Sequence, residues 1–309
     1  MFSGSWVATR LVKRVQKGGP SSFDMALIPY KKPHATAQQR VEHLRRKGLI
    51  IARPKVAAEK IEAIGYERLR IYFLSRRDLH NLPGRPFLPN TSYRDIIQLY
   101  ECDMKLRDAC FVAVGQFELL FRNSISEALS RAYGSHPYSD PSAFKDAASQ
   151  RDAVSSFRKI YKQSKDGRAR HYAATYSTPA LPPIWTMKEF LTFGAASRIF
   201  QCLSGSIRSA VAKDFGVDKE PVFTAWVECL VDLRNICAHH DRLFNRSFQK
   251  QPGLYKRANV PTAPRNRLKA ILECLDYLMA QRGSKTQLTA QVGRIIARHP
   301  AVLPREVGY

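Results

Sequence analysis

The run from Leu233 to Arg246 contains an arginine, an amide and two histidines close together: Arg234, Asn235, His239 and His240. Histidine is the only side chain whose unperturbed pKa lets it exchange protons near neutral pH. Arginine keeps its charge and presents a planar fork of donors that matches phosphate oxygens. Asparagine can donate to a phosphate or hold an imidazole in one tautomer. These residue types suit RNA cleavage without a metal, in which a base activates the 2′-hydroxyl beside a fixed cation.

The same residues also fit a plain helix end, where Arg and His side chains cap carbonyls or lie in solvent. On a continuous helix, Asn235 and His239 share a face that Arg242 and Arg246 continue. Arg234 points about 140° away from His239 on such a helix. Either the helix breaks after Asn235, or a second copy of the motif completes the site. His239 is the leading histidine, His240 is nearly as good, and one of the two is expected to be structural.

Four stretches in order resemble the Abi_2-type abortive-infection proteins, the AbiD/AbiF-like group. The stretches are Lys32-Pro33 to Gly48-Leu49, Tyr93 to Gly134, Leu181 to Gly194, and the run around Arg234. The second holds Tyr100, Asp103, Leu106, Arg107, Glu118 and Arg122 at the positions that the family pattern leads us to expect. Together the four cover roughly residues 30–282.

This resemblance places the chain in the broad HEPN class of helical ribonucleases, whose signature is Arg-x4-6-His with a polar residue after the arginine. It implies an all-α, HEPN-like helical bundle and a site formed across a homodimer. It also implies an endoribonuclease that leaves a 2′,3′-cyclic phosphate and a 5′-hydroxyl, with no metal or cofactor. The expected setting is bacterial phage defence by abortive infection, or a toxin–antitoxin system. AbiF-like relatives suggest a small regulatory RNA as a further partner. The alternative is a non-catalytic RNA-binding protein that retains the HEPN scaffold.

Two ion pairs interrupt the apolar pattern of residues 93–132. Asp103 and Arg107 are four residues apart, as are Glu118 and Arg122, so each pair shares one helical face. Pairs set among apolar neighbours are expected to be buried, either as purely structural contacts or as supports of a nearby site. Glu118 and Arg122 are the preferred supports for Arg234 and the histidines.

The chain of 309 residues has a formal charge of +24, which favours a polyanionic partner such as RNA. The excess of Lys and Arg lies mainly within residues 1–50 and 246–309. The residues predicted to bind RNA are Arg242, Arg246, Lys31, Lys32, Arg45 and Arg46. Six scattered cysteines without a Cys-x-x-Cys pair favour a reducing cytoplasm. No apolar run is long enough to span a bilayer, and no membrane partner is expected.

Turn signals divide the chain into four expected parts. Residues 1–28 form a flexible basic extension, 29–90 a small N-terminal helical subdomain, 91–282 the HEPN-like domain, and 283–309 a basic C-terminal tail. The pair of helices in the second part either resembles a helix-turn-helix or simply packs on the core.

Apolar periodicity and cap residues predict the individual helices. The predicted spans are about 36–48, 54–64, 93–132 with a break near Cys102 or Gly115, 141–165, 184–204, 206–215, one starting at Pro221, 268–282 and 289–298. A basic loop from Lys162 to His171 either contacts RNA or is solvated.

Other chemistries find no support in the sequence. His239, His240 and Asp241 are adjacent, and three adjacent residues rarely converge on one metal ion. The chain has no Walker A loop, no Gly-x-Gly-x-x-Gly and no Gly-x-Ser-x-Gly elbow. Nucleotidyl transfer therefore lacks a signature.

Overall fold

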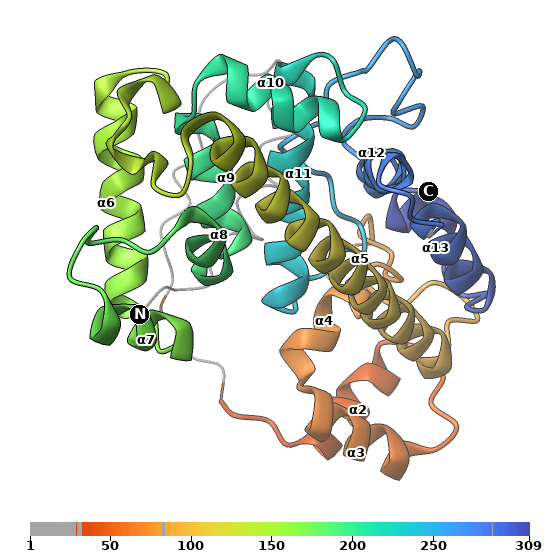
Figure 1. Cartoon of the computed structure of the whole chain (residues 1–309). Coiled ribbons are helices and arrows are strands. Elements are labelled where there is room, and N and C mark those ends of the chain that lie inside the picture. The colour runs from red at the N-terminus through yellow and green to blue at the C-terminus, as the bar shows by residue number, and fades with distance from the viewer. Residues whose placement is uncertain (1–28, 30–32, 82–83, 286) are drawn as a thin grey trace, which may run out of the picture.

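The computed structural model describes residues 29, 33–81, 84–285 and 287–309, which form helices joined by turns (Figure 1). Isolated β-bridges, such as Ile50 with Ser92, are the only strand pairing in these ranges. The all-α prediction is confirmed. The expected extension at 1–28, with Lys31 and Lys32, lies outside the described residues.

Helix α5, Tyr93–Tyr133, runs through the centre of the molecule and contacts α4, α8, α9, α10, α11 and α13 (Figure 1). A capping box of Ser92 and Asp95 starts it, and Gly134 with φ of 72° ends it. The predicted break near Cys102 or Gly115 is wrong, because α5 is unbroken. One glycine costs a helix only about 1 kcal/mol, and buried side chains along the whole length of α5 outweigh that cost.

The N-terminal helices are α2, Ala37–Arg46, α3, Pro54–Ile64, and α4, Tyr66–Leu74. Thr36 and Gln39 form a capping box at the start of α2, and Thr36 is the first residue of the span predicted for this helix. The bounds of α3 also agree with the prediction. The prediction missed α4, which follows Gly65 directly and packs against α5.

The middle of the chain departs most from the prediction. It contains α6, Ala147–Gln163, α7, Gly167–Thr175, α8, Ile184–Met187, a 3-10 turn η3, Lys188–Phe190, α9, Phe193–Cys202, and α10, Gly205–Asp214. The predicted basic loop from Lys162 to His171 is mostly helical, because α6 extends to Gln163 and Asp166 caps α7. The predicted helix 184–204 is interrupted at Leu191 and restarts where the Thr192 side chain caps Ala195.

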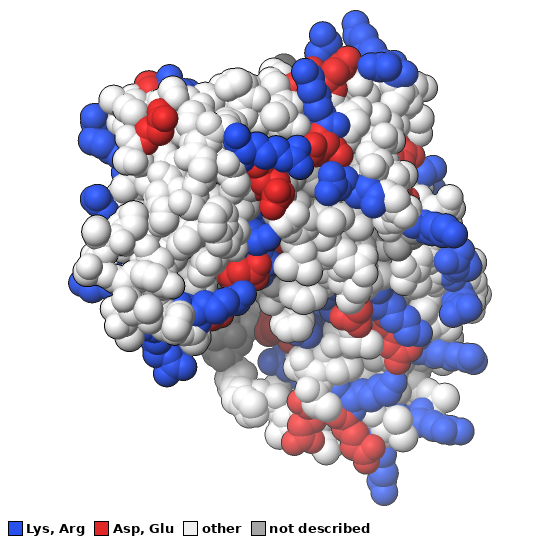
Figure 2. Space-filling model, viewed as in Figure 1, with Lys and Arg blue, Asp and Glu red and all other residues white. Residues whose placement is uncertain are grey.

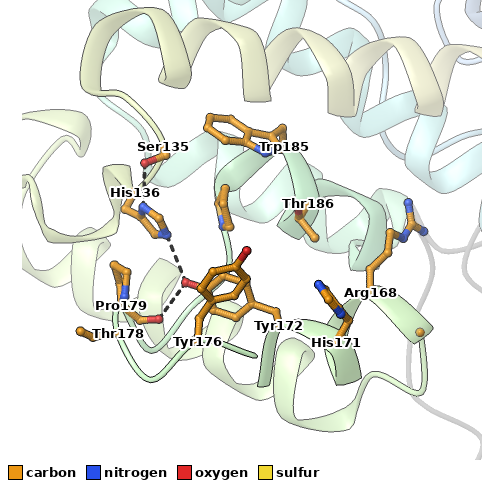
Figure 3. Close-up of a pocket in the computed structure, with 12 residues that line it drawn as sticks. Ser135, His136, Arg168, His171, Tyr172, Tyr176, Thr178, Pro179, Trp185 and Thr186 are labelled. Carbon is orange, nitrogen blue, oxygen red and sulfur yellow. Dashed lines mark hydrogen bonds between the residues drawn. The ribbon is translucent and has the colours of Figure 1, made fainter. Parts of the chain in front are cut away.

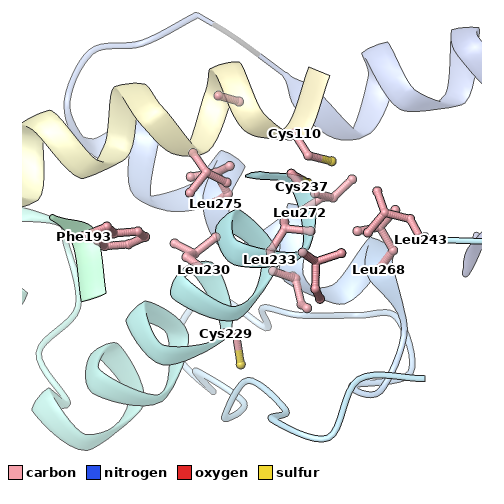
Figure 4. Packing of buried hydrophobic residues seen from close by; sticks show 14 of the residues in the cluster. Cys110, Phe193, Cys229, Leu230, Leu233, Cys237, Leu243, Leu268, Leu272 and Leu275 are labelled. Atoms are coloured by element: carbon pink, nitrogen blue, oxygen red, sulfur yellow. The ribbon is translucent and has the colours of Figure 1, made fainter. Parts of the chain in front are cut away.

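The C-terminal part holds α11, Glu220–Ala238, α12, Leu268–Gln281, α13, Leu288–Ala297, and a 3-10 turn η4, Pro304–Val307. Pro221 lies in the first turn of α11, which begins at Glu220, and the predicted spans of α12 and α13 hold within two residues. The α11 side chains Leu230, Leu233 and Cys237 pack among residues of α5 and α12 (Figure 4). This packing fixes the end of α11 against the centre of the fold. No helix among the described residues is long and apolar enough to cross a bilayer.

Candidate functional site

The last turns of α11 carry Arg234 and Asn235. The helix continues without a break to Ala238, and His239 is its C-cap, with φ of −88° and ψ of 8°. The amide of His239 donates to the carbonyl of Asn235 over 3.0 Å. The predicted alternative of a break after Asn235 is therefore wrong. Arg234 and His239 leave one helix on different faces, about 140° apart.

His240 ends the helix in a left-handed conformation, with φ of 54°. Its amide donates to Cys237 over 3.0 Å, and the amide of Asp241 donates to Ile236 over 2.9 Å. These two bonds form a Schellman motif with histidine at the position that glycine usually occupies. Arg68 of α4 donates to the carbonyl of His240 over 3.0 Å. The turn is thus held both by its own backbone bonds and by α4.

Arg242 and Arg246 do not continue the face of α11, so the geometric reason for grouping them with His239 is wrong. Arg242 donates to the carbonyl of Phe244 over 2.5 Å, and Arg246 donates to that of Arg242 over 2.7 Å. Burial, and after it the positive charge of Arg246, lowers the pKa of Arg242. These hydrogen bonds are internal to the loop that follows α11. Arg45 and Arg46 are exposed in the last turn of α2.

Glu118 of α5 joins the two arginines that the sequence linked to it. One carboxylate oxygen lies 3.4 Å from Arg122, and the other lies 3.8 Å from Nε of Arg234. Arg122 also donates to the carbonyl of Leu191 over 2.6 Å. The guanidinium of Arg234 lies 5.8 Å from the ring centre of Phe111. The side chain of Arg234 keeps 31% of its surface exposed, so it is held in place and open to solvent.

Asp103 supports the loop that follows the histidines. Its Oδ2 accepts from the hydroxyl of Tyr72 over 2.6 Å and from Arg107, while Oδ1 accepts from the amides of Leu243 and Phe244 over 2.9 and 2.8 Å. Asp103 is fully buried. Burial, and after it the charge of Asp103, raises the pKa of Tyr72. This pair fixes the path of the chain after α11.

The two histidine side chains are exposed, as is Asn235. Within the described ranges, no hydrogen bond or ion pair involves either imidazole ring. The same ranges contain no group of three or more His, Cys, Asp or Glu residues placed to hold a metal ion. The structure thus brings Glu118 and Arg122 to Arg234 and places His239 and His240 one turn further on.

Three residues that contact this site were not among the predicted site residues. Phe111 lies seven residues before Glu118, so helical spacing could have placed it on the same face. Arg68 and Tyr72 belong to α4, which was not predicted. No spacing rule relates α4 to residues 240–244, which lie far along the chain.

Charge on the drawn face does not single out one path for a polyanion. Lys and Arg side chains are spread mainly around the edge of the molecule, with Asp and Glu among them (Figure 2). The site is therefore better located by its contacts than by net charge.

Residues 59–245 match the sequence profile of the family of Abi-like proteins. The chain belongs to this abortive-infection family. The matched part extends over well more than half of the chain and contains both ion pairs, Arg234 and the two histidines. A search of curated proteins and a search of solved structures each found no match.

Proposed function

We propose that this Abi-like protein is a metal-independent endoribonuclease that acts in bacterial abortive infection or a related toxin–antitoxin system. The observation that carries the proposal is the setting of Arg234. A carboxylate oxygen of Glu118 lies 3.8 Å from Nε of Arg234, and the Arg234 side chain stays partly exposed. Two exposed histidines follow Arg234 within six residues. An exposed cation beside imidazoles, which can both accept and donate a proton, suits a scissile phosphate.

In the proposed reaction, one histidine accepts the proton of a ribose 2′-hydroxyl. The 2′-oxygen attacks the adjacent phosphorus, and the bond from phosphorus to the 5′-oxygen breaks. The leaving oxygen takes a proton, so the products are a 2′,3′-cyclic phosphate and a 5′-hydroxyl. Arg234 stabilises the charge that gathers on the phosphoryl oxygens. Glu118 keeps the guanidinium oriented, and Asn235 donates to the phosphate.

The divergence of Arg234 and His239 on unbroken α11 favours a site completed by a second copy of the chain. An exposed apolar strip on α5 provides a contact surface for that copy. The strip consists of Met104, Phe111, Val112 and Leu119, with relative exposures of 37%, 44%, 62% and 59%. These residues fall within about 100° of the helix circumference, and Phe111 contacts Arg234 directly. Exposed apolar patches of this kind are typical of protein interfaces.

A cleavage assay in EDTA tests the proposal. Single-stranded RNA is incubated with the wild type, with Arg234→Ala and with the double variant His239→Ala/His240→Ala, and products are analysed for cyclic phosphate ends. We expect wild-type cleavage, with the rate falling by about 10²–10⁴-fold when the acid–base group is lost. Circular dichroism of each variant verifies folding. Equal cleavage by the wild type and the folded double variant would disprove the catalytic assignment.

A second candidate is a non-catalytic RNA-binding protein with the same scaffold. The pairing of Arg234 with Glu118 favours it, because that carboxylate already neutralises part of the charge a phosphate needs. The same assay separates the two functions. A non-catalytic protein binds labelled RNA and releases it intact at every protein concentration.

A further inference from the structure

A second site lies away from α11, in a cavity of about 680 Å³ formed by α7, α8 and the chain that follows α5 (Figure 3). The volume lies within the range of small-molecule sites. Its wall includes Trp185, Tyr176, Tyr172 and His136. The first two are open to solvent, while Tyr172 is buried.

Trp185 and Tyr176 give the cavity two exposed aromatic walls. Their relative exposures are 48% and 53%, and they are the two most exposed Phe, Tyr or Trp side chains among the described residues, ahead of Phe111 at 44%. Figure 3 places Trp185 on one side of the cavity and Tyr176 on the other. The ring of Tyr176 rests on Tyr172, with centroids 5.0 Å apart. No ring contact or hydrogen bond of Trp185 occurs within the described part of the chain, so its faces are available to a planar ligand.

A hydrogen-bonded chain fixes the polar side of the cavity. The hydroxyl of Tyr172 donates to the carbonyl of Pro179 over 2.9 Å, so it accepts from Nε2 of His136, 3.5 Å away. The other ring nitrogen of His136 then accepts from the hydroxyl of Ser135 over 2.7 Å. This chain orients the His136 ring before any ligand arrives (Figure 3). A preorganised wall of this kind lowers the entropy cost of binding.

The segment from α6 to α7 that adjoins the cavity is strongly basic. Its residues 158–170 contain one acid, Asp166, and six exposed cations: Arg158, Lys159, Lys162, Lys165, Arg168 and Arg170. Arg168 is already bound to Asp166 over 2.9 Å and lies 3.5 Å from Glu189. Arg168 is therefore part of the cavity wall. The other five cations are free of this role and can attract a polyanion.

Elements that touch both sites connect the cavity to Arg234. The bridge from Arg168 to Glu189 joins α7 to η3. Arg122 donates a hydrogen bond to the carbonyl of Leu191, the residue directly after η3. Arg122 also forms an ion pair with Glu118, which is the partner of Arg234 as well. Along α5, Glu118 and Tyr133 are about 22 Å apart at the usual rise per residue. One extended single strand of a few nucleotides covers that distance.

We propose that this cavity binds an unstacked base of single-stranded RNA, with Trp185 and Tyr176 on its faces and the basic segment along its backbone. The choice of RNA rests on the proposed function. Two aromatic walls take any base, because every base has a π face. An apolar ligand would leave the oriented His136 and the five cations other than Arg168 without a role. The base at this site lies several nucleotides from the phosphate that is cleaved at Arg234.

Binding of a fluorescent single-stranded RNA tests the cavity separately from catalysis. The RNA carries 2′-O-methyl groups, which remove the attacking hydroxyl and prevent cleavage. We compare the wild type with Trp185→Ala, Trp185→Phe and Tyr176→Ala, and use Leu254→Ala, an exposed apolar residue outside the cavity, as matched control. Each variant is first verified as folded by circular dichroism. Loss of one stacking wall should weaken binding by about 5- to 100-fold. Trp185→Phe keeps a ring and should stay within about twofold of the wild type.

Tryptophan fluorescence adds a direct readout. The chain has three tryptophans, of which Trp226 is buried, so the difference between the wild type and Trp185→Phe reports Trp185. RNA should quench this difference signal, and adenosine monophosphate alone is the second arm. Quenching by the mononucleotide without any RNA binding would show that the cavity takes a free nucleotide and would contradict the proposal that its ligand is a base of RNA. Equal RNA affinity of the wild type and Trp185→Ala, with no quenching, would overturn the cavity itself.

The two proposals fail separately in these assays. If the wild type cleaves natural RNA and Trp185→Ala does so with an unchanged KM, the cavity proposal is wrong and the ribonuclease proposal stands. If the wild type binds RNA through Trp185 but cleaves nothing in EDTA, the cavity proposal stands and the ribonuclease proposal is wrong.

Discussion

At the scale of single residues, Glu118 controls how the charge of Arg234 is presented. The carboxylate sits 3.8 Å from Nε of Arg234 and 3.4 Å from Arg122, and it is buried. Such a group orients the cation, and in the proposed reaction it would act only through Arg234. Glu118→Gln keeps the shape and removes the charge, so Arg234 loses its partner and gains freedom.

We expect Glu118→Gln to lower kcat about 10-fold while KM changes little, because orientation matters most in the transition state. Glu127→Gln, an exposed acid on the same helix, is the matched control. The measurement is RNA cleavage at several substrate concentrations. A rise in KM alone would assign Glu118 to RNA binding instead.

The two histidines differ in backbone conformation. His240 adopts φ of 54°, which an L side chain tolerates poorly, whereas His239 has φ of −88°. His240→Gly should therefore stabilise the fold by about 1 kcal/mol. His239→Gly gains no such relief and should lose stability. Urea unfolding of both variants measures this difference.

The same two variants assign the acid–base group. If His239 is that group, His240→Gly stays active and His239→Gly does not. A destabilised His240→Gly protein would contradict the conformational argument, whichever histidine is active.

At the scale of elements, local signals predicted some helices well. Thr36, Pro54 and Pro221 lie at the starts of α2, α3 and α11, where each acts locally on the first turn of its helix. The interruption at Leu191 was missed, because Arg122 of another helix holds the Leu191 carbonyl. Thr192, which caps α9, was the one local signal available there.

The candidate site also has parts that local sequence signals predict and parts that they do not. Spacing linked Glu118 to Arg122 and singled out Arg234, and the structure brings all three together. The end of α11 was harder to predict, because histidine takes the place of the usual C-terminal glycine. The contacts from Arg68 and Tyr72 depend on α4, so no local pattern could reveal them.

The buried pair Asp103 and Arg107 joins α4, α5 and the loop after α11. Asp103→Ala leaves Arg107 as an uncompensated buried charge and strips two backbone amides of their acceptor. We expect a loss of about 3–5 kcal/mol of unfolding free energy. Urea unfolding measures it, with the exposed Glu127→Ala as control. The double change Asp103→Leu/Arg107→Met should recover much of the loss, and a double variant as unstable as Asp103→Ala would refute the ionic explanation.

The junction of α3 and α5 should weaken at high pH. Burial raises the pKa of Tyr93 to about 12, and its hydroxyl donates to the carbonyl of Ala57 over 3.3 Å. A raised folded pKa means that the contribution of Tyr93 is complete below the unfolded pKa of about 10 and is lost as the pH rises through 12. Tyr93→Phe should reduce the fall in stability between pH 10 and 12. Identical pH profiles of the wild type and Tyr93→Phe in urea unfolding would contradict this.

At the scale of the whole molecule, the unbroken α11 and the exposed strip on α5 are the two features on which we base the proposal of a homodimer. Arg234 lies beside Phe111, at the edge of the strip of Met104, Phe111, Val112 and Leu119. We propose that a symmetric pair of chains buries this strip, which would bring the two α11 ends toward each other. In the proposed dimer, Arg234 of one chain would lie near His239 of the other, so that neither chain alone would hold a complete site.

Mixing inactive variants tests this arrangement. Arg234→Ala and His239→Ala are each expected to be inactive alone. After the chains exchange, mixed dimers contain one intact pair of Arg234 and His239, so about a quarter of the wild-type activity should return for random pairing of equal amounts. Leu119→Glu places a charge on the strip and should give monomers by sedimentation, with activity lost in parallel. Because Glu127→Lys changes the charge of α5 away from the strip, it should leave both the dimer and the activity unchanged. A dilute wild-type monomer that cleaves RNA at the full rate would rule out a shared site.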